Sequence, residues 1–338
     1  MEKSRIIILV VLAGVIAVVI WQRFIRDDFN LPRGGETKIE KISIPDSEAG
    51  GNTSFSTKEI MITNGVKHSV PLKEVIGGGP QKDGIPSIDK PKFISINEAD
   101  GFLKDTEPGI SVETNGVARF YPFQILVWHE IVNDVINGQR ILVTYCPLCL
   151  SGIVFDPVVK GERVEFGTSG KLWNSNLVMY DRKTESLWSQ ILGEAIVGEM
   201  TGVKLKVLPS DQLRYGEFKK LHPQGEVLSR ATGAVRIYGS DPYGDYYTTP
   251  GTYFPISKKD DRLQEKDFVL GIVVDGKAKA YFPPAVKQKG EITDNFQGKT
   301  IVAQYEKDID AVRLFQKTEN GKLERINPFG AFWFSWVA

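Results

Sequence analysis

The feature of this chain that most limits its possible folds is an internal repeat. The segment Gly116–Tyr121, Gly-Val-Ala-Arg-Phe-Tyr, is matched by Gly276–Tyr281, Gly-Lys-Ala-Lys-Ala-Tyr. The offset is 276 − 116 = 160 residues, and it continues without a gap. An offset shared over such a length predicts two related lobes. Five further pairs lie at this offset: Asp134 and Asp294, Gly138 and Gly298, Ile141 and Ile301, Tyr145 and Tyr305, Phe155 and Phe315.

Local patterns within the first repeat predict an α+β fold that is rich in strands. Ile110–Tyr121 alternates around Asn115-Gly116, which is typical of a β-hairpin. The proline that follows predicts a helix over Phe123–Val135, ended by Asn137-Gly138, and then a buried strand over Ile141–Tyr145. We expect antiparallel sheets with short helices and no doubly wound sheet.

Downstream of this repeat the pattern is again one of short strands between turns. A helix capped by Ser210-Asp211 and ending near Leu221 is also expected. The predicted strands are Ile153–Phe155, Val164–Gly167, Leu177–Tyr180, Ser186–Ser189 and Val203–Leu208.

The N-terminus carries an unbroken apolar run, Ile6–Trp21, which predicts a transmembrane helix. Lys3 and Arg5 precede the run, and Asp27 and Asp28 offset the arginines that follow it. We therefore expect a single-pass anchor in the cytoplasmic membrane, with its N-terminus inside and the bulk of the chain extracytoplasmic. A cleaved signal peptide is the alternative, although no small-residue cleavage site follows the run.

The predicted organisation has four parts: an anchor over 1–26, a flexible tether over 27–57, a first lobe over 58–240 and a repeat-related second lobe over 241–338. Forty-two Lys and Arg residues balance 42 Asp and Glu residues. This balance gives no electrostatic reason to expect nucleic acid as a partner. The expected partner is the membrane, through the N-terminal helix, and the composition specifies no protein or small-molecule ligand.

The chain has two cysteines, and both lie in one Cys-Pro-Leu-Cys motif, Cys146 and Cys149. At the repeat offset the second lobe carries Glu306 and Ile309 in their places. The repeated scaffold therefore does not require the thiols, which favours a functional role for the pair. An extracytoplasmic location would tend to oxidise them unless a metal or a partner prevents it.

A metal site is one hypothesis for the pair, completed by His129, whose counterpart in the second lobe is Lys289. Two thiolates and one imidazole suit copper, with zinc as the other candidate. A closed structural zinc site would need a second pair of ligands.

Three other hypotheses stay open for Cys146 and Cys149. The first is thiol redox chemistry on a scaffold other than thioredoxin, because a turn and a strand follow the motif where thioredoxin has a helix. The second is a structural disulfide, although its small ring adds little stability. The third is a cysteine nucleophile with His129 as its base and Glu130, Asn133 or Asp134 as the orienting group.

A second polar cluster is predicted to surround the thiols and to bind a cofactor or ligand. The alternative is that Asp181–Thr184 forms a hairpin turn and that Trp188 is a core residue. The aromatic tail, Phe332–Trp336, is expected to pack between the lobes. The cluster comprises Ser169, Tyr180, Asp181, Arg182 and Gln190.

Several runs resemble a bacterial and archaeal family catalogued as domain of unknown function 3179: Trp-His-Glu-Ile-Val-Asn-Asp, Val-Thr-Tyr-Cys-Pro-Leu-Cys, Val-Met-Tyr-Asp-Arg and Ser-Leu-Trp-Ser-Gln. The resemblance extends from about Ile60 to the C-terminus. It implies that His129, Cys146 and Cys149 occupy the motif positions of that family, and it implies no particular reaction. The expected function is a metal-binding or thiol-redox site, and the alternative is a non-catalytic surface interaction module with a structural disulfide.

Overall fold

The computed structural model describes residues 29, 31–45 and 55–338, and the predicted anchor at Ile6–Trp21 lies outside them. Within these described residues, no helix is both long enough and apolar enough to cross a membrane. Strands dominate, and α4 (Tyr215–Leu221) and α5 (Pro283–Lys289) are helices of seven residues each. The predicted strand-rich class with several antiparallel sheets and short helices is confirmed.

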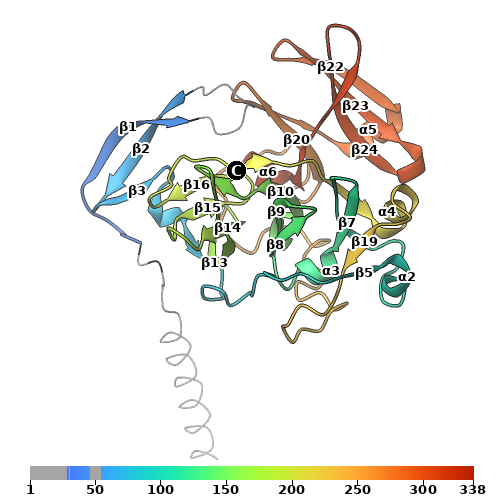
Figure 1. The fold of residues 1–338 in the computed structure, drawn as a ribbon. Coiled ribbons are helices and arrows are strands. Elements are labelled where there is room, and N and C mark those ends of the chain that lie inside the picture. The colour runs from blue at the N-terminus through green and yellow to red at the C-terminus, as the bar shows by residue number, and fades with distance from the viewer. Residues whose placement is uncertain (1–28, 30, 46–54) are drawn as a thin grey trace, which may run out of the picture.

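One sheet has eight strands in the order β1-β2-β3-β16-β15-β14-β13-β4, and its first three strands extend away from the body of the molecule (Figure 1). Strand β1 lies inside the stretch 27–57 that the sequence predicted to be a flexible tether. It pairs with β2 along its whole length, because its alternating Lys-Ile-Glu-Lys-Ile pattern suits a strand. The bounds are β1 (Thr37–Pro45), β2 (Phe55–Thr63), β3 (Val66–His68), β4 (Ile76–Gly77), β13 (Phe166–Trp173), β14 (Asn176–Asp181), β15 (Leu187–Ser189) and β16 (Glu194–Val197).

Two further sheets form the first repeat unit, in the orders β18-β6-β7-β19-β5 and β17-β10-β9-β8. The predicted hairpin at Asn115-Gly116 joins β6 to β7, and both of its turn residues have a positive φ, as such a turn requires. The remaining elements between 72 and 228 are η1 (Leu72–Glu74), β5 (Phe93–Ser95), α2 (Ile96–Ala99), β6 (Pro108–Thr114), β7 (Val117–Pro122), α3 (Phe123–Leu126), β8 (Ile131–Ile136), β9 (Gln139–Cys146), η2 (Pro147–Cys149), β10 (Ser151–Asp156), β11 (Val158–Val159), β12 (Glu162–Arg163), β17 (Lys206–Val207), β18 (Asp211–Arg214) and β19 (Glu226–Leu228).

The helix predicted over Phe123–Val135 is wrong beyond its first turn. Helix α3 ends at Leu126, and Ile131–Ile136 forms β8, which pairs antiparallel with β9. Asn137-Gly138 is therefore the turn of a hairpin and not the end of a helix. The β-branched residues of β8 and the long-range partner β9 outweigh the local helix signal.

The helix predicted from Ser210-Asp211 also starts later than expected. Asp211–Arg214 is strand β18, which pairs with β6, and α4 begins at Tyr215. The predicted strand over Val203–Leu208 is reduced to β17. In both cases the boundary of the element depends on the strand with which it pairs, and a local sequence pattern does not identify that partner.

The second unit reproduces the element bounds of the first at the offset of 160. Strands β20, β22 and β23 start and end 160 residues after β6, β8 and β9, and η3 does so relative to η2. In Figure 1 this unit is the red body that lies beside the green strands of the first. Its elements are β20 (Phe268–Val274), β21 (Lys277–Tyr281), α5, β22 (Glu291–Phe296), β23 (Lys299–Glu306), η3 (Lys307–Ile309), β24 (Ala311–Lys317), β25 (Leu323–Ile326), β26 (Phe329–Phe332) and α6 (Trp333–Val337).

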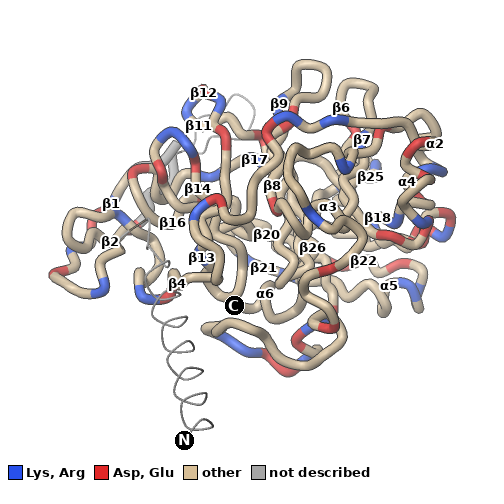
Figure 2. Tube along the Cα trace, turned by 90° about the horizontal axis from the view of Figure 1, so that it is seen from below, with Lys and Arg blue, Asp and Glu red and all other residues tan. Residues whose placement is uncertain are grey.

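The C-terminal tail joins the two units. Strand β26 pairs with β20 of the second unit, while Phe332 and Phe334 pack in the same hydrophobic cluster as Cys146 and Cys149. The predicted packing of the aromatic tail between the lobes is therefore confirmed. Charged residues of both signs are interspersed along the chain trace (Figure 2). The two thiols lie in a buried hydrophobic cluster.

Candidate functional site

The cysteine motif forms a tight turn between two antiparallel strands. Cys146 is the last residue of β9, η2 carries the chain to Cys149, and β10 starts at Ser151, opposite Cys146. Leu150 closes the turn with a φ of 50°. As predicted, a turn and a strand follow the motif, where a thioredoxin-type dithiol has an α-helix.

Both cysteines are free and buried, with exposed fractions of 1% for Cys146 and 0% for Cys149. The two thiols interact with each other, and this interaction shifts their pKa values in opposite directions. Burial, the hydrogen bond to Cys149 and the neighbouring negative charge raise the pKa of Cys146 well above its usual value. Burial would also raise the pKa of Cys149, but hydrogen bonds from Cys146, Ser335 and Asn176 outweigh it and lower that pKa. Cys149 is thus the thiol that ionises first.

The turn between β13 and β14 supplies polar contacts to Cys149. Asn174 and Ser175 have φ values of 50° and 61°, which lets the chain reverse tightly beside the thiol. The Asn176 side-chain amide donates a hydrogen bond to Cys149 Sγ at 3.4 Å, and the thiol itself can donate to the Ser175 carbonyl at 3.3 Å. A thiolate at Cys149 would keep the amide donor, which favours the ionised form.

A buried carboxyl group, that of Glu130, lies near both thiols. Burial raises the pKa of Glu130 to about 8, and the negative charge of its ionised form raises the pKa of Cys146. Glu130 is therefore mostly protonated at neutral pH and close to its titration point. Such a group can accept or return a proton without a large change in free energy.

The backbone at Glu130 adopts a conformation that glycine favours over glutamate. Glu130 has a φ of 58°, and its carbonyl accepts a hydrogen bond from the Tyr145 N–H at 2.7 Å. In the second unit Gly290 stands at the equivalent position with a φ of 79°, and its carbonyl accepts from the Tyr305 N–H at 2.8 Å. Glycine serves this left-handed conformation without strain, whereas a glutamate there is strained. The first unit thus retains a strained residue whose carboxyl group faces the thiol site.

Three tyrosines from the segment 243–247 cover the turn. The Tyr246 hydroxyl donates to the Leu148 carbonyl at 3.0 Å, inside the cysteine motif. Burial raises the pKa of Tyr243, Tyr246 and Tyr247, and negative charge on the cysteines adds to the effect. The sequence analysis missed these residues, although the density of tyrosines between 238 and 247 is a visible signal.

The structure does not bring His129 together with the two cysteines as a ligand set. His129 Nδ1 lies 2.7 Å from the Pro86 carbonyl, and Nε2 lies 2.6 Å from the Tyr238 hydroxyl, so both ring nitrogens have other partners. Burial lowers the pKa of His129. Within the described ranges, no three His, Cys, Asp or Glu side chains are placed to hold a metal ion. His129 is also not placed as the base of a cysteine nucleophile.

Of the predicted polar cluster, Gln190 belongs to the thiol site. Its carbonyl oxygen accepts hydrogen bonds from Asn176 at 3.0 Å and from Ser151 at 2.9 Å, and its amide donates to Thr144 at 3.1 Å. Gln190 is completely buried. It therefore fixes the position of Asn176, which in turn contacts Cys149.

The other four predicted residues have partners elsewhere. Ser169 donates to the Val178 carbonyl, and Tyr180 donates to Asp83 at 2.6 Å. Asp181 accepts from the backbone of the turn Asp181–Thr184 and from Trp188 Nε1 at 2.9 Å. Arg182 pairs with Asp89 and Glu165 on the surface. These contacts match the alternative interpretation of a hairpin turn and a core tryptophan.

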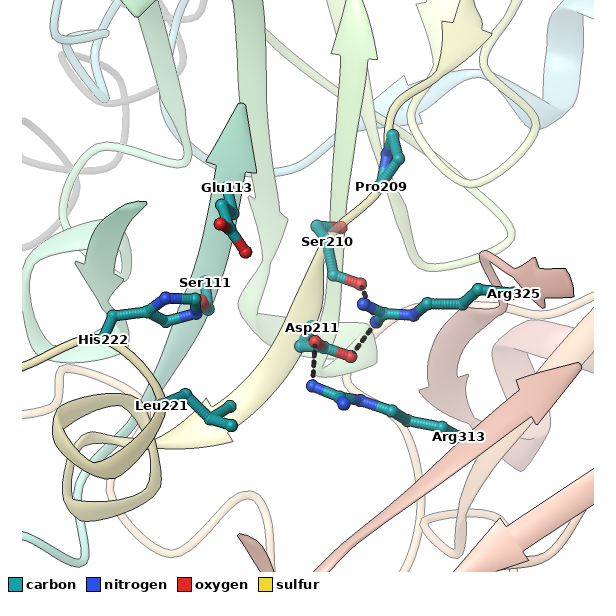
Figure 3. A pocket seen from close by; sticks show the side chains of 9 residues that line it. All are labelled: Ser111, Glu113, Pro209, Ser210, Asp211, Leu221, His222, Arg313 and Arg325. Atoms are coloured by element: carbon teal, nitrogen blue, oxygen red, sulfur yellow. Dashed lines mark hydrogen bonds and ion pairs between the residues drawn. The ribbon is translucent and has the colours of Figure 1, made fainter. Parts of the chain in front are cut away.

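Within the described part of the chain, two of the cavities lie between residues of both units, and these two differ in chemistry. A polar cavity of about 480 Å³ contains Glu113 and His222 on one side, and Arg313 and Arg325, both paired with Asp211, on the other (Figure 3). An apolar cavity of about 440 Å³ is lined by residues that include Asn176 and Ser335, two of the residues that contact Cys149 from outside its motif. The apolar cavity is thus the one that reaches the thiol site.

Residues 82–338 match the family model described as "Protein of unknown function (DUF3179)". The chain belongs to this family. The match includes both repeat units and the complete cysteine motif, as the resemblance in sequence implied. No curated protein and no solved structure matches the chain, so the DUF3179 assignment carries no activity with it and the function has to be argued from the site.

Proposed function

We propose that this DUF3179 protein is a thiol-redox protein in which Cys146 and Cys149 cycle between a dithiol and a disulfide. The observation that carries the proposal is the geometry of the pair: both thiols are free and buried in one tight turn, and the Asn176 amide donates to Cys149 Sγ at 3.4 Å. This contact agrees in direction with a lowered pKa at Cys149 beside a raised one at Cys146. The thiolate is the nucleophile in disulfide exchange, and a second thiol of higher pKa can resolve the product. A purely structural pair would not need this difference.

In the proposed reaction the Cys149 thiolate attacks a substrate disulfide. One substrate sulfur leaves as a thiolate and takes up a proton from solvent, which replaces the proton that Cys149 released when it ionised. The other substrate sulfur stays bound to Cys149 as a mixed disulfide. The Cys146 thiol then attacks the Cys149 sulfur and loses its proton to Glu130 in its ionised form. The second substrate thiolate leaves and takes up that proton. The protein ends as a disulfide and the substrate as two thiols, so that two electrons and two protons have passed to it.

Glu130 fits the role of proton acceptor because its pKa of about 8 lies near neutral pH. Its carboxyl group lies close enough to raise the pKa of Cys146 when it is ionised. The three-ligand copper or zinc site predicted from the sequence is not part of this proposal, since both nitrogens of His129 are engaged by other groups.

The location of this chemistry is a proposal of its own. The apolar run Ile6–Trp21 and the charges around it favour a membrane anchor with the site outside the cytoplasm. A disulfide cycle suits that compartment, where cytosolic reductants do not act directly. Digestion of intact cells with a membrane-impermeant protease would test the topology of the full chain, because only extracytoplasmic segments are cleaved.

The redox proposal is tested by equilibrating the full-length protein with dithiothreitol buffers and counting free thiols. We expect one two-electron transition with a reduction potential between about −300 and −120 mV, the range of exchangeable dithiols. The Cys149→Ser variant is the control and should show no transition. A potential far below about −300 mV would indicate an inert structural disulfide and would contradict the proposal. Metal analysis of protein purified without oxygen tests the copper or zinc alternative in the same preparation.

A further inference from the structure

We propose that the apolar cavity beside Cys149 binds the substrate, and that this substrate is an uncharged disulfide carried on an aliphatic chain. The inference rests on the proposed redox function and adds the substrate class to it. We call this cavity the Trp336 pocket. It is defined by Trp173, Asn176, Leu205, Phe329, Ser335 and Trp336.

The Trp336 pocket is built by both units of the molecule. The β13–β14 turn and Leu205 belong to the first unit, while Val273 and Ala278 come from the β20–β21 hairpin of the second. Helix α6 contributes Ser335 and Trp336 and brings them against the first unit. The second unit lacks thiols of its own, and on this proposal it supplies one wall of the substrate site.

Two polar side chains separate the pocket from the Cys149 sulfur, and they are held differently. Asn176 is fixed, since it donates to Gln190 at 3.0 Å and accepts from the Ile191 N–H at 3.1 Å. Ser335 is 6% exposed, its hydroxyl is buried, and within the described part of the chain that hydroxyl makes no hydrogen bond of normal geometry. Ser335 is therefore held less firmly than Asn176 and can turn aside at the cost of its weak contact with Cys149, which opens the way from the pocket to the sulfur.

A buried hydroxyl without a partner normally marks a place where a ligand or water completes the bonding. Ser335 also lies close enough to Cys149 to lower the pKa of that thiol. A substrate sulfur that approaches Cys149 from the pocket would meet this hydroxyl, which can donate to the thiolate that leaves. The Ser335 hydroxyl and the more acidic thiol thus lie at the same end of the pocket.

The size and lining of the pocket limit the substrate. A volume of about 440 Å³ lies in the range that holds small molecules and excludes a folded protein domain. The walls are mainly aliphatic and aromatic, and the lining residue Lys204 pairs with Glu194, so a peptide disulfide with several charges would lose much of its hydration there. An aliphatic chain that ends in a strained cyclic disulfide fits both the walls and the chemistry. Attack by Cys149 opens that ring, and attack by Cys146 releases the open-chain dithiol.

The test measures how fast the reduced full-length protein is oxidised by two probes, lipoamide and oxidised glutathione. Each rate is divided by the rate of the same probe with free dithiothreitol, which removes the intrinsic reactivity. We expect a preference of at least about tenfold for lipoamide, with saturation at high concentration, because only the uncharged probe enters an apolar site. Equal corrected rates would overturn the proposal.

A matched pair of variants locates the effect. Ala278→Trp should fill the mouth of the pocket and remove the preference for lipoamide, since Ala278 is an exposed lining residue. Lys277→Trp is the control, because Lys277 is its exposed neighbour in β21 and does not line the pocket. An unchanged preference in Ala278→Trp would also overturn the proposal. The reduction potential at equilibrium separates the two proposals: a normal potential without any preference removes only the pocket, and the lack of a transition removes the redox function.

Discussion

The two repeat units of this protein have the same order of elements and differ in what they carry at the η2 and η3 turns. Even the internal contacts correspond. Tyr121 donates to Asp134 at 2.6 Å in the first unit, and Tyr281 donates to Asp294 at 3.2 Å in the second. Arg119 pairs with Asp134, and Lys279 pairs with Asp294. The comparison shows that the same elements and the same internal contacts form in a unit that has no cysteines.

Three positions distinguish the unit that contains the thiols from the unit that lacks them. Cys146, Cys149 and Glu130 of the first unit correspond to Glu306, Ile309 and Gly290 of the second. Glu130 is the most informative of the three, because glycine is the residue that its backbone conformation favours. The second unit thus shows what the fold prefers at each position of the site.

The largest expected effect comes from the thiols themselves. Cys149→Ser should slow the oxidation of the reduced protein by a small disulfide by at least about 100-fold, because it leaves only the thiol of raised pKa. Cys146→Ser should instead react and stop as a trapped mixed disulfide, which mass spectrometry detects as the added mass of one substrate thiol. If both variants reacted at the same rate and trapped the same mixed disulfide, Cys149 would not be the specific attacking thiol and Cys146 would not be the specific resolving thiol.

The second prediction concerns how the stability of the protein depends on pH through Glu130, a residue of the first unit that the second unit replaces with Gly290. The pKa of Glu130 is raised to about 8 in the folded protein, so the folded state binds more protons than the unfolded state between about pH 4.5 and 8. The free energy of unfolding should therefore fall as the pH rises through this window, by on the order of 3 kcal/mol. Glu130→Gln should remove this dependence. Denaturant titrations at pH 5 and pH 8 provide the measurement, and the same slope in both proteins would argue against a buried neutral carboxyl group.

A third prediction separates proton transfer from nucleophilic attack. Glu130→Gln keeps the shape of the side chain and removes the proton acceptor, so the resolving step should slow by about 10- to 100-fold. The mixed disulfide should then accumulate, while the initial attack by Cys149 stays at a similar rate. Rapid quenching with acid followed by mass spectrometry distinguishes the two steps. If attack and resolution slowed together, Glu130 would have only a structural role.

The smallest expected effect tests the backbone comparison between Glu130 and Gly290. Gly290→Ala should destabilise the protein by about 1 kcal/mol, since alanine is strained at a φ of 79° even though the added Cβ meets no atom within 4 Å. In the first unit, Glu130→Gly should be more stable than Glu130→Ala by a similar amount, about 1 kcal/mol. Thermal or denaturant unfolding of the three variants gives the comparison. A Glu130→Ala variant as stable as Glu130→Gly would show that the glutamate conformation costs nothing.

Some of the fold followed from local pattern and some did not. The hairpin at Asn115-Gly116 was predicted because its turn type is fixed by two residues. The same dipeptide at Asn137-Gly138 predicts a helix end on local grounds, because the proline before α3 starts a helical pattern. Strand β8 exists through its pairing with β9, and such a pairing is a long-range fact that a local window does not contain.

For the candidate site the division is similar. The position of Cys146 and Cys149 in one motif, and their absence from the second unit, were determined by the sequence alone, because a repeat offset compares positions without any coordinates. Which groups surround the sulfur atoms was decided only by the tertiary structure. His129 looked like a ligand because it precedes the cysteine strand, yet its side chain bonds to Pro86 and Tyr238. Asn176, Ser335 and Glu130 reach the thiols because β-strand pairing and the packing of the tail bring distant segments together, and burial among them then sets each pKa.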